Sequence, residues 1–297
     1  MDITLRSEIK SRQIESSPTG FRWLCSLASR LEDCLFETIN LDLMGLTWFD
    51  ANLCSVLGAI FYKANRNINT VKITNLPNRI KNILSKNNFL SSYGGGALED
   101  TYSTTIQYLR FDKEDDRFFV QYLENNLMGK AIPRMSPALH DEFIGGLMEI
   151  FNNAVIHSET RYGIFACGQY FPAKERVDFT ITDLGIGIRE NIKKHRGYDF
   201  SAENAIDWAM SGNTTKRKAD GIPGGLGLKC VREFIRKNQG YIQVVSNNGY
   251  WEQTRDGNVN MELFPDTFPG TVVNISINTS DPCSYKLSSE VSLNEIF

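Results

Sequence analysis

Apolar residues recur at helical spacing from about residue 137 to residue 158, which predicts the long helix around which the rest of the chain is organised. Its apolar positions fall mostly on one side and would anchor it in a core: Phe143, Leu147, Ile150, Ala154 and Val155. Glu149, Asn153 and His157 recur at i, i+4 and i+8, so they lie nearly in line on the other side. A solvated polar face would explain this column equally well, and only the rest of the chain favours a functional interpretation.

The first part of the chain alternates predicted strands and helices. Residues 1–20 are polar and close with a turn at residues 16–20. Phe36 counts among the apolar members of the first strand, and Asp50 is a good N-cap for the helix after it. The expected elements are a helix at 23–31, a strand at 35–43, a helix after Asp50, a strand at 71–73 and a helix opened by Pro77. This order predicts a small α/β unit with parallel strands.

The second part begins after a glycine-rich break at residues 91–96. The pattern predicts a strand at 104–111, a charged and then apolar helix at 112–128, the long helix, a strand at 177–183, helices at 202–210 and 229–237, and a strand at 270–277. We therefore expect an α/β domain at 1–100, a connecting strand and helix at 101–135, a second domain at 136–281 and a tail at 282–297.

Composition narrows the class of protein. The chain has 297 residues, of which 41% are hydrophobic and 23% charged, as in ordinary soluble globular proteins of about two domains. A formal net charge of −3 argues against a broad surface for nucleic acid, and no apolar run suits a signal peptide or a membrane span. Six scattered cysteines suggest a reducing compartment, so we expect a cytoplasmic protein with no membrane partner, and three histidines make a zinc site improbable.

The strand at residues 177–183 ends in an acid and a glycine loop. Asp183 stands at the end of the strand, and Gly185 and Gly187 follow. A lone carboxylate there can accept a hydrogen bond from an exocyclic amine such as the N6 of adenine, and the glycines let the backbone approach a flat ligand. A dinucleotide-binding fingerprint would need glycine at position 190, which is Glu190.

A glycine-dense segment at residues 221–228 leads directly into the helix at 229–237. Free amides at a helix N-terminus behind glycines can cradle phosphates, and the polar, basic residues 211–218 before them would form a lid. The spacing is not that of a P-loop, because Lys229 follows Gly227 and Leu228 with no Ser or Thr after it. A flexible surface loop is the alternative. The last strand begins with Thr271, whose hydroxyl could reach Asp183 or a base.

The order of these motifs resembles the GHKL ATPases, also called HATPase_c or Bergerat-fold domains. It is a polar helix, a strand with Asp183-x-Gly185-x-Gly187, a lid, a Gly-Gly-x-Gly-Leu helix and a Gly-Thr strand. The resemblance covers about residues 137–279 and is closest to the anti-sigma-factor serine kinases and to histidine-kinase-like ATPases. It implies an α/β sandwich in which helices cover one face of a mixed sheet. No histidine-bearing dimerisation helix precedes the domain at the usual distance, and no transducer domain follows residue 281.

The resemblance also implies ATP and Mg²⁺ as cofactors and assigns roles to residues. Asn153 would coordinate Mg²⁺, Glu149 would polarise water or an acceptor hydroxyl, and Asp183 would bind adenine N6. The further nucleotide contacts that it implies are His157, Gly185, Gly187, Ile188, Thr215, Lys216, Gly224, Gly225, Leu226, Gly227, Leu228 and Thr271.

Residues 35–92 more modestly resemble a STAS domain, the fold of anti-sigma-factor antagonists. The likeness depends on the strand, the loop, Asp50 at the helix start and the strand–helix unit that follows. Antagonists of this family carry a phosphorylatable serine just after that aspartate, and here the position holds Ala51, followed by Asn52. The resemblance therefore implies a docking or regulatory role without a phosphorylation switch at that place. An unrelated α/β domain is the alternative.

Three functions remain open at this stage. The first is an ATP-dependent switch or protein serine/threonine kinase that acts on a protein partner, such as a separate STAS-like or transcription-regulatory protein. The second is a nucleotide-gated ATPase without phosphotransfer. The third is a non-catalytic module that holds ATP or ADP. A homodimer is compatible with each of them.

Overall fold

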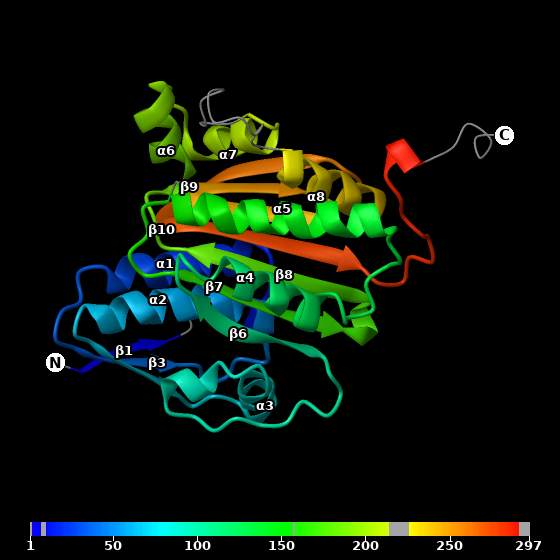
Figure 1. Cartoon of the computed structure of the whole chain (residues 1–297). Coiled ribbons are helices and arrows are strands. Elements are labelled where there is room, and N and C mark those ends of the chain that lie inside the picture. The colour runs from blue at the N-terminus through cyan, green and yellow to red at the C-terminus, as the bar shows by residue number, and fades with distance from the viewer. Residues whose placement is uncertain (1, 7–9, 157, 214–225, 291–297) are drawn as a thin grey trace.

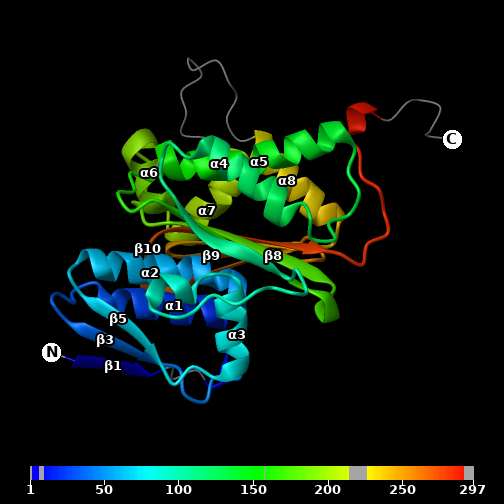
Figure 2. The ribbon, with the colours of Figure 1, turned by 60° about the horizontal axis from the view of Figure 1, so that its bottom comes forward.

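The computed structural model of the chain describes residues 2–6, 10–156, 158–213 and 226–290. These residues form four stacked layers, a three-stranded sheet, a pair of helices, a five-stranded sheet and a group of helices, which are seen edge-on in Figure 2. The α/β class expected from the sequence is confirmed. No helix in these ranges is long and apolar enough to cross a membrane.

The N-terminal part supplies the small sheet and the helix pair (Figure 1). Its elements are β1 (Asp2–Arg6), β2 (Gln13–Ile14), α1 (Pro18–Leu31), β3 (Thr38–Asp42), β4 (Trp48–Phe49), the 3₁₀ turn η1 (Ala51–Leu53), α2 (Cys54–Arg66), β5 (Thr70–Thr74), α3 (Asn78–Lys86) and the 3₁₀ turn η2 (Leu90–Tyr93). The small sheet has the order β1-β3-β5 with parallel neighbours, so the predicted parallel pairing is confirmed. β1 lies in a stretch that was expected to be a polar lead-in.

Two expectations for this part are wrong in detail. Phe36 is not a buried strand residue: its side chain is 71% exposed and its backbone is left-handed, because β3 starts only at Thr38. Asp50 directly precedes η1 but caps no helix. Its carboxylate instead accepts hydrogen bonds from the Ser16 amide at 2.8 Å and from the Trp48 indole at 2.6 Å.

The helices α1 and α2 lie between the two sheets. α1 starts where the Ser17 side chain accepts a hydrogen bond from the Gly20 amide at 3.2 Å, with Pro18 in the first turn. α2 is enclosed on all sides over residues 54–61, which are all buried. A Cβ added at Gly58 would lie 2.3 Å from the Tyr108 hydroxyl oxygen, so the close approach to its neighbours requires glycine there.

The large sheet has the order β6-β7-β8-β10-β9. Its strands are β6 (Thr105–Phe111), β7 (Ile164–Phe171), β8 (Arg176–Asp183), β9 (Tyr241–Gln253) and β10 (Val259–Asn278). Every neighbouring pair is antiparallel, instead of the mixed sheet that was expected. Helices also cover both of its faces and not one, because α1 and α2 pack on the face opposite to the long helix. β6, expected in a connecting segment, is an edge strand of this sheet.

The outer helical layer positions the candidate site. It contains α4 (Asp116–Tyr122) with a π turn (Leu123–Leu127), the long helix α5 (Pro137–Ile156), α6 (Gly187–Arg196), α7 (Ala202–Met210) and α8 (Leu226–Lys237), and short 3₁₀ turns lie at Pro172–Lys174 and Ser288–Glu290. α5 and α7 are confirmed almost to the residue, whereas α6, β7 and β9 were not predicted. The apolar side of α5 is buried as expected at Phe143, Leu147 and Ile150.

Candidate functional site

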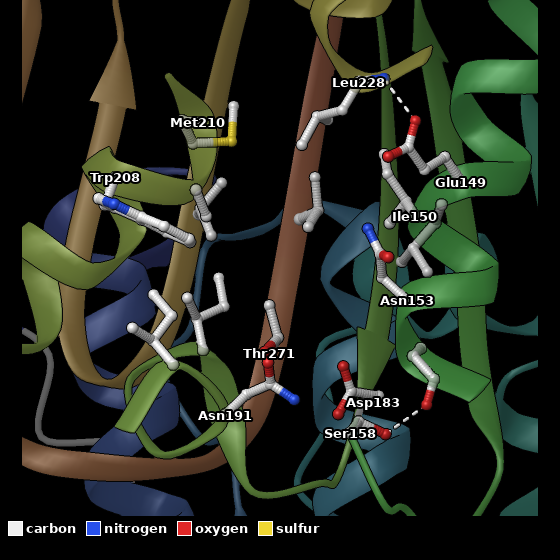
Figure 3. A pocket seen from close by; sticks show the side chains of 18 of the residues that line it. Glu149, Ile150, Asn153, Ser158, Asp183, Asn191, Trp208, Met210, Leu228 and Thr271 are labelled. Atoms are coloured by element: carbon white, nitrogen blue, oxygen red, sulfur yellow. Dashed lines mark hydrogen bonds between the residues drawn. The ribbon is translucent and has the colours of Figure 1, made fainter. Parts of the chain in front are cut away.

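The polar column of α5 lines a cavity of about 150 Å³ between this helix, the large sheet and helices α6, α7 and α8. Glu149 and Asn153 both face it, and Figure 3 shows the Asn153 amide on the same side as Asp183, across from Trp208. The structure therefore brings together seven of the predicted site residues: Glu149, Asn153, Asp183, Gly187, Ile188, Leu228 and Thr271. At Glu149 and Asn153, the members of the column that the structure describes, the helix thus forms the wall of a pocket and not a solvated face.

Asp183 ends β8 at the base of this pocket and is only 5% exposed. Burial raises the pKa of its carboxyl group to about 7, although hydrogen bonds from the Gly185 amide, the Ser158 hydroxyl and the Thr271 amide act against the rise. The Gly185 amide lies 2.8 Å from its Oδ1. A carboxylate this dry is available to a ligand that offers a donor in return for its lost water.

Thr271 lies directly across from Asp183 in the register of β8 and β10. Its hydroxyl is 3.0 Å from that of Ser246, whose Oγ also accepts a hydrogen bond from the Ile188 amide at 2.8 Å. The Thr271 hydroxyl therefore lies beside Asp183, as expected from the sequence. It belongs to a small polar group that also fixes the start of α6.

Of the two glycines after Asp183, Gly187 lines the pocket as expected and Gly185 does not. A Cβ at Gly185 would lie 2.0 Å from the Ser158 carbonyl oxygen, so this glycine lets the loop pack against the end of α5 and does not line the cavity. Gly187 does line it. Its φ of +79° and the 2.4 Å between an added Cβ and the Asn247 side chain make glycine necessary there too.

The N-terminus of α8 meets the carboxylate of α5. The Leu228 amide donates a hydrogen bond to Glu149 Oε2 at 3.3 Å, drawn as a dashed line in Figure 3. Glu149 thus occupies an amide at the helix end where a phosphate was expected to bind. The helix start at Leu226 and Gly227 is described by its backbone only, and the remaining predicted contacts lie outside the described residues: His157, Thr215, Lys216, Gly224 and Gly225.

Other pocket residues were not predicted from the sequence. Asn191 comes from α6, and Trp208 and Met210 come from α7, so these two helices form the wall facing Asn153 (Figure 3). Ile181, Val244 and Val273 on the sheet form an apolar floor. The sequence contains one indication of Trp208: α7, which carries it, was predicted directly before the lid-like segment.

A buried polar network joins the opposite face of the sheet to η1. Asn52 Nδ2 lies 2.8 Å from Ser16 Oγ and 3.0 Å from both Thr180 Oγ1 and Asn274 Oδ1. Asn274 also donates to Gln243 Oε1 at 2.9 Å. Asn52, Thr180 and Asn274 are fully buried. Thr180 lies on β8 three residues before Asp183, so the N-terminal part holds the strand that carries the pocket carboxylate.

Within the described residues, no three histidine, cysteine or carboxylate side chains cluster in a way that could hold a metal ion. Any divalent cation in this pocket would therefore take few protein ligands. The amide oxygen of Asn153 is a suitable one, since Mg²⁺ prefers oxygen and commonly keeps waters and substrate phosphates as its other ligands.

Comparison with known proteins leaves the family open. No known family and no curated protein sequence matches the chain. Among solved structures, it is similar to the histidine kinase domain of the blue-light-activated histidine kinase from Erythrobacter litoralis EL346, with 13% identity over 87% of this chain and 94% of that one and a TM-score of 0.30. A likeness at that score does not establish a common fold.

Proposed function

We propose that the chain binds Mg-ATP in the α5 pocket and acts as a nucleotide-dependent regulatory switch on a protein partner, as an ATPase or a protein serine/threonine kinase. The observation that carries this proposal is the convergence of three groups. A buried carboxylate lies at the base of the pocket, an amide oxygen in its wall, and a second carboxylate at a helix N-terminus. These groups suit the purine, the metal and the phosphate end of one ligand.

The base of the pocket suits a purine amine. Asp183 in its ionised form would accept a hydrogen bond from adenine N6, with Thr271 beside it. Trp208, Met210 and Ile188 supply apolar and aromatic surface for a flat ring. A small number of polar groups within an apolar lining is the usual composition of a nucleotide site.

The upper end of the pocket suits phosphates and their cation. Asn153 would give Mg²⁺ one protein ligand, and the cation would neutralise phosphate charge. The Leu228 amide, now bonded to Glu149, would be available to a phosphate oxygen once that carboxylate turns away. Glu149 would then orient a water molecule or an acceptor hydroxyl and accept its proton.

A phosphate acceptor would have to come from another protein. Ala51 stands where STAS-like antagonists carry their serine, Asn52 follows it, and both are fully buried against the large sheet. They contact the face of the sheet opposite to the pocket, because Asn52 bonds to Thr180 and Asn274 while Ile181, Asp183 and Val273 line the pocket. Transfer to this position of the chain itself is therefore excluded, because it carries no acceptor hydroxyl and is buried.

Calorimetry of the full chain with ATP and Mg²⁺ tests the proposal. We expect binding that Asp183→Ala weakens by about 1–3 kcal/mol, because the exocyclic amine would lose its buried partner. Glu149→Gln should keep binding and lose turnover. No heat of binding for the wild-type chain, or an affinity that Asp183→Ala leaves unchanged, would refute the site.

Labelled ATP then separates the activities. Free phosphate without labelled protein would indicate a nucleotide-gated ATPase, and label on an added STAS-like protein would indicate a kinase. Tight nucleotide without either product would indicate a binding module, and Glu149→Gln would then change nothing measurable.

A further inference from the structure

A second cavity, of about 270 Å³, lies away from the nucleotide pocket, between α3, β4 and β7. One wall is a single face of α3, since Arg79, Asn82, Ile83 and Lys86 have the spacing i, i+3, i+4 and i+7. Trp48 and Gln169 face this helix from the other side. We call this cavity the α3 groove. It has an apolar floor and cations at both ends of one wall.

Arg79 is held ready to bind an anion. Its guanidinium carbon lies 4.8 Å from the centre of the Trp48 ring, and the Trp48 indole is itself fixed by its hydrogen bond to Asp50. Over the described ranges, no carboxylate lies within ion-pair distance of Arg79. A guanidinium stacked on an aromatic ring keeps its in-plane N–H donors free for a carboxylate or phosphate.

The chain segment that carries α3 is one-sided in charge, although carboxylates from outside this segment lie near the groove: Asp50 bonds to Trp48, and Glu15 pairs with Lys174 beside the Trp48 ring. Residues 51–98 contain six cationic residues, which are Lys63, Arg66, Lys72, Arg79, Lys81 and Lys86, and no Asp or Glu, although the whole chain has a net charge of −3. Two of the six have a carboxylate partner: Lys63 pairs with Glu32 at 2.9 Å and Lys86 with Asp100 at 3.8 Å. This local excess of positive charge would attract a negatively charged partner and suppress binding of a basic one.

We propose that the α3 groove is a docking site for an acidic segment of a protein partner. Two acidic side chains of the segment would pair with Arg79 and Lys86, and an apolar side chain between them would pack on Trp48 and Ile83. The two cations are seven residues apart on the helix, about 10 Å along its axis. An extended segment spans that length with about three residues. A nucleic acid would require a broader basic surface than this narrow groove.

The groove adjoins the segment that joins the two sheets. Gln169 in the groove wall accepts a hydrogen bond from the Ala51 amide at 3.2 Å, and Asn52 is the next residue. A partner seated here would touch the connection between the N-terminal part and β8. The docking proposal itself does not depend on nucleotide binding, and its test is made without nucleotide.

The test measures binding of a fluorescein-labelled twelve-residue peptide with the repeat Glu-Leu-Ser, in which every third residue is Glu, to the full chain by fluorescence polarisation. A peptide with Gln in place of Glu is the matched control. We expect binding of the acidic peptide that weakens with added salt, and at least about tenfold weaker binding of the Gln peptide. Arg79→Ala should weaken binding of the acidic peptide about tenfold or more, and Arg79→Lys by less, because lysine keeps the charge and loses the planar fork.

Lys81→Ala is the control variant on the protein, since Lys81 is exposed on α3 but lies outside the groove. It should bind as the wild type does, and circular dichroism should show equal melting temperatures for all variants. Absence of binding, equal binding by Arg79→Ala, or preference for a twelve-nucleotide single-stranded DNA or a phosphatidylglycerol vesicle over the acidic peptide would overturn the proposal.

Discussion

At the scale of the residue, Asp183 differs from an ordinary surface carboxylate in its burial and in the pKa that results from it. It is nearly fully buried, and burial raises its pKa to about 7. A carboxyl group accepts a hydrogen bond from an exocyclic amine most effectively when it is ionised. Recognition of a purine at this site should therefore depend on pH within one unit of neutrality.

We predict that ATP affinity falls about tenfold between pH 8 and pH 6, because protons compete with the amine for a carboxylate whose pKa is about 7. Calorimetry across this range measures the effect. Asp183→Asn is the matched control, since its amide oxygen still accepts a hydrogen bond but cannot titrate, and its affinity should be flat. The same slope in both proteins would show that another group titrates.

The empty protein should respond to pH in the opposite direction. The raised pKa means that the folded state binds this proton more tightly than the unfolded state does. Asp183 therefore contributes stability that is complete below about pH 4 and is lost as the pH rises through about 7. Asp178 adds to this trend, since burial raises its pKa to about 6. Denaturant unfolding without nucleotide measures this effect. The free energy of unfolding should fall as the pH rises from about 4 to about 8, and it should fall less in Asp183→Asn than in the wild type.

At the scale of the element, the sequence predicts the helices and strands whose pattern is unambiguous. α5 has an unbroken helical period, and β8 ends in an acid followed by glycines. β7 was missed because it is mostly apolar and buried on both faces, so it lacks the alternation of a strand with one wet face. β9 is also buried over most of its length, but it was missed because polar residues such as Gln243 and Ser246 interrupt its apolar pattern.

The residues of the candidate site also fall into those that the sequence could predict and those that it could not. Asp183 and Thr271 could be paired from the sequence because both lie at ends of strands with recognisable motifs. Trp208 and Asn191 could not, since they reach the pocket only through the packing of α6 and α7 against β9 and β10. The pattern of apolar and polar residues within α6 and α7 does not show how these helices pack against the sheet.

The junction between η1 and the large sheet gives a prediction at this scale. Asn52→Ala removes the donor that lies within 3.0 Å of Ser16, Thr180 and Asn274. The buried Thr180 and Asn274 oxygens then keep only their mutual hydrogen bond at 2.8 Å and lose a second one. We expect the substitution to lower the free energy of unfolding by about 1–3 kcal/mol. Urea titration measures this. Asn65→Ala, at an exposed site on α2, should change it by less than about 0.5 kcal/mol. Equal effects would mean that the network contributes no stability.

At the scale of the whole molecule, the N-terminal part and the large sheet share one core. A single cluster of buried apolar residues contains Leu57 and Phe61 from α2 together with Val245 from β9 and Val272 from β10. Neither part can lose its structure without exposing apolar surface of the other.

We therefore predict one cooperative thermal transition for the full chain and not two. Scanning calorimetry should give a calorimetric enthalpy close to the van't Hoff enthalpy, and far-ultraviolet dichroism and tryptophan fluorescence should report the same midpoint. Two separated transitions, with one lost when residues 1–100 are removed, would instead indicate that the two parts fold independently.

The enclosure of α2 sets a limit on how this protein can diverge. An ordinary amphipathic helix keeps one side that tolerates almost any polar residue, but residues 54–61 have no such side. Even an added methyl group at Gly58 would meet the ring of Tyr108. Related sequences should therefore vary little over residues 54–61, and this short run would identify distant relatives better than the lining of the α5 pocket does.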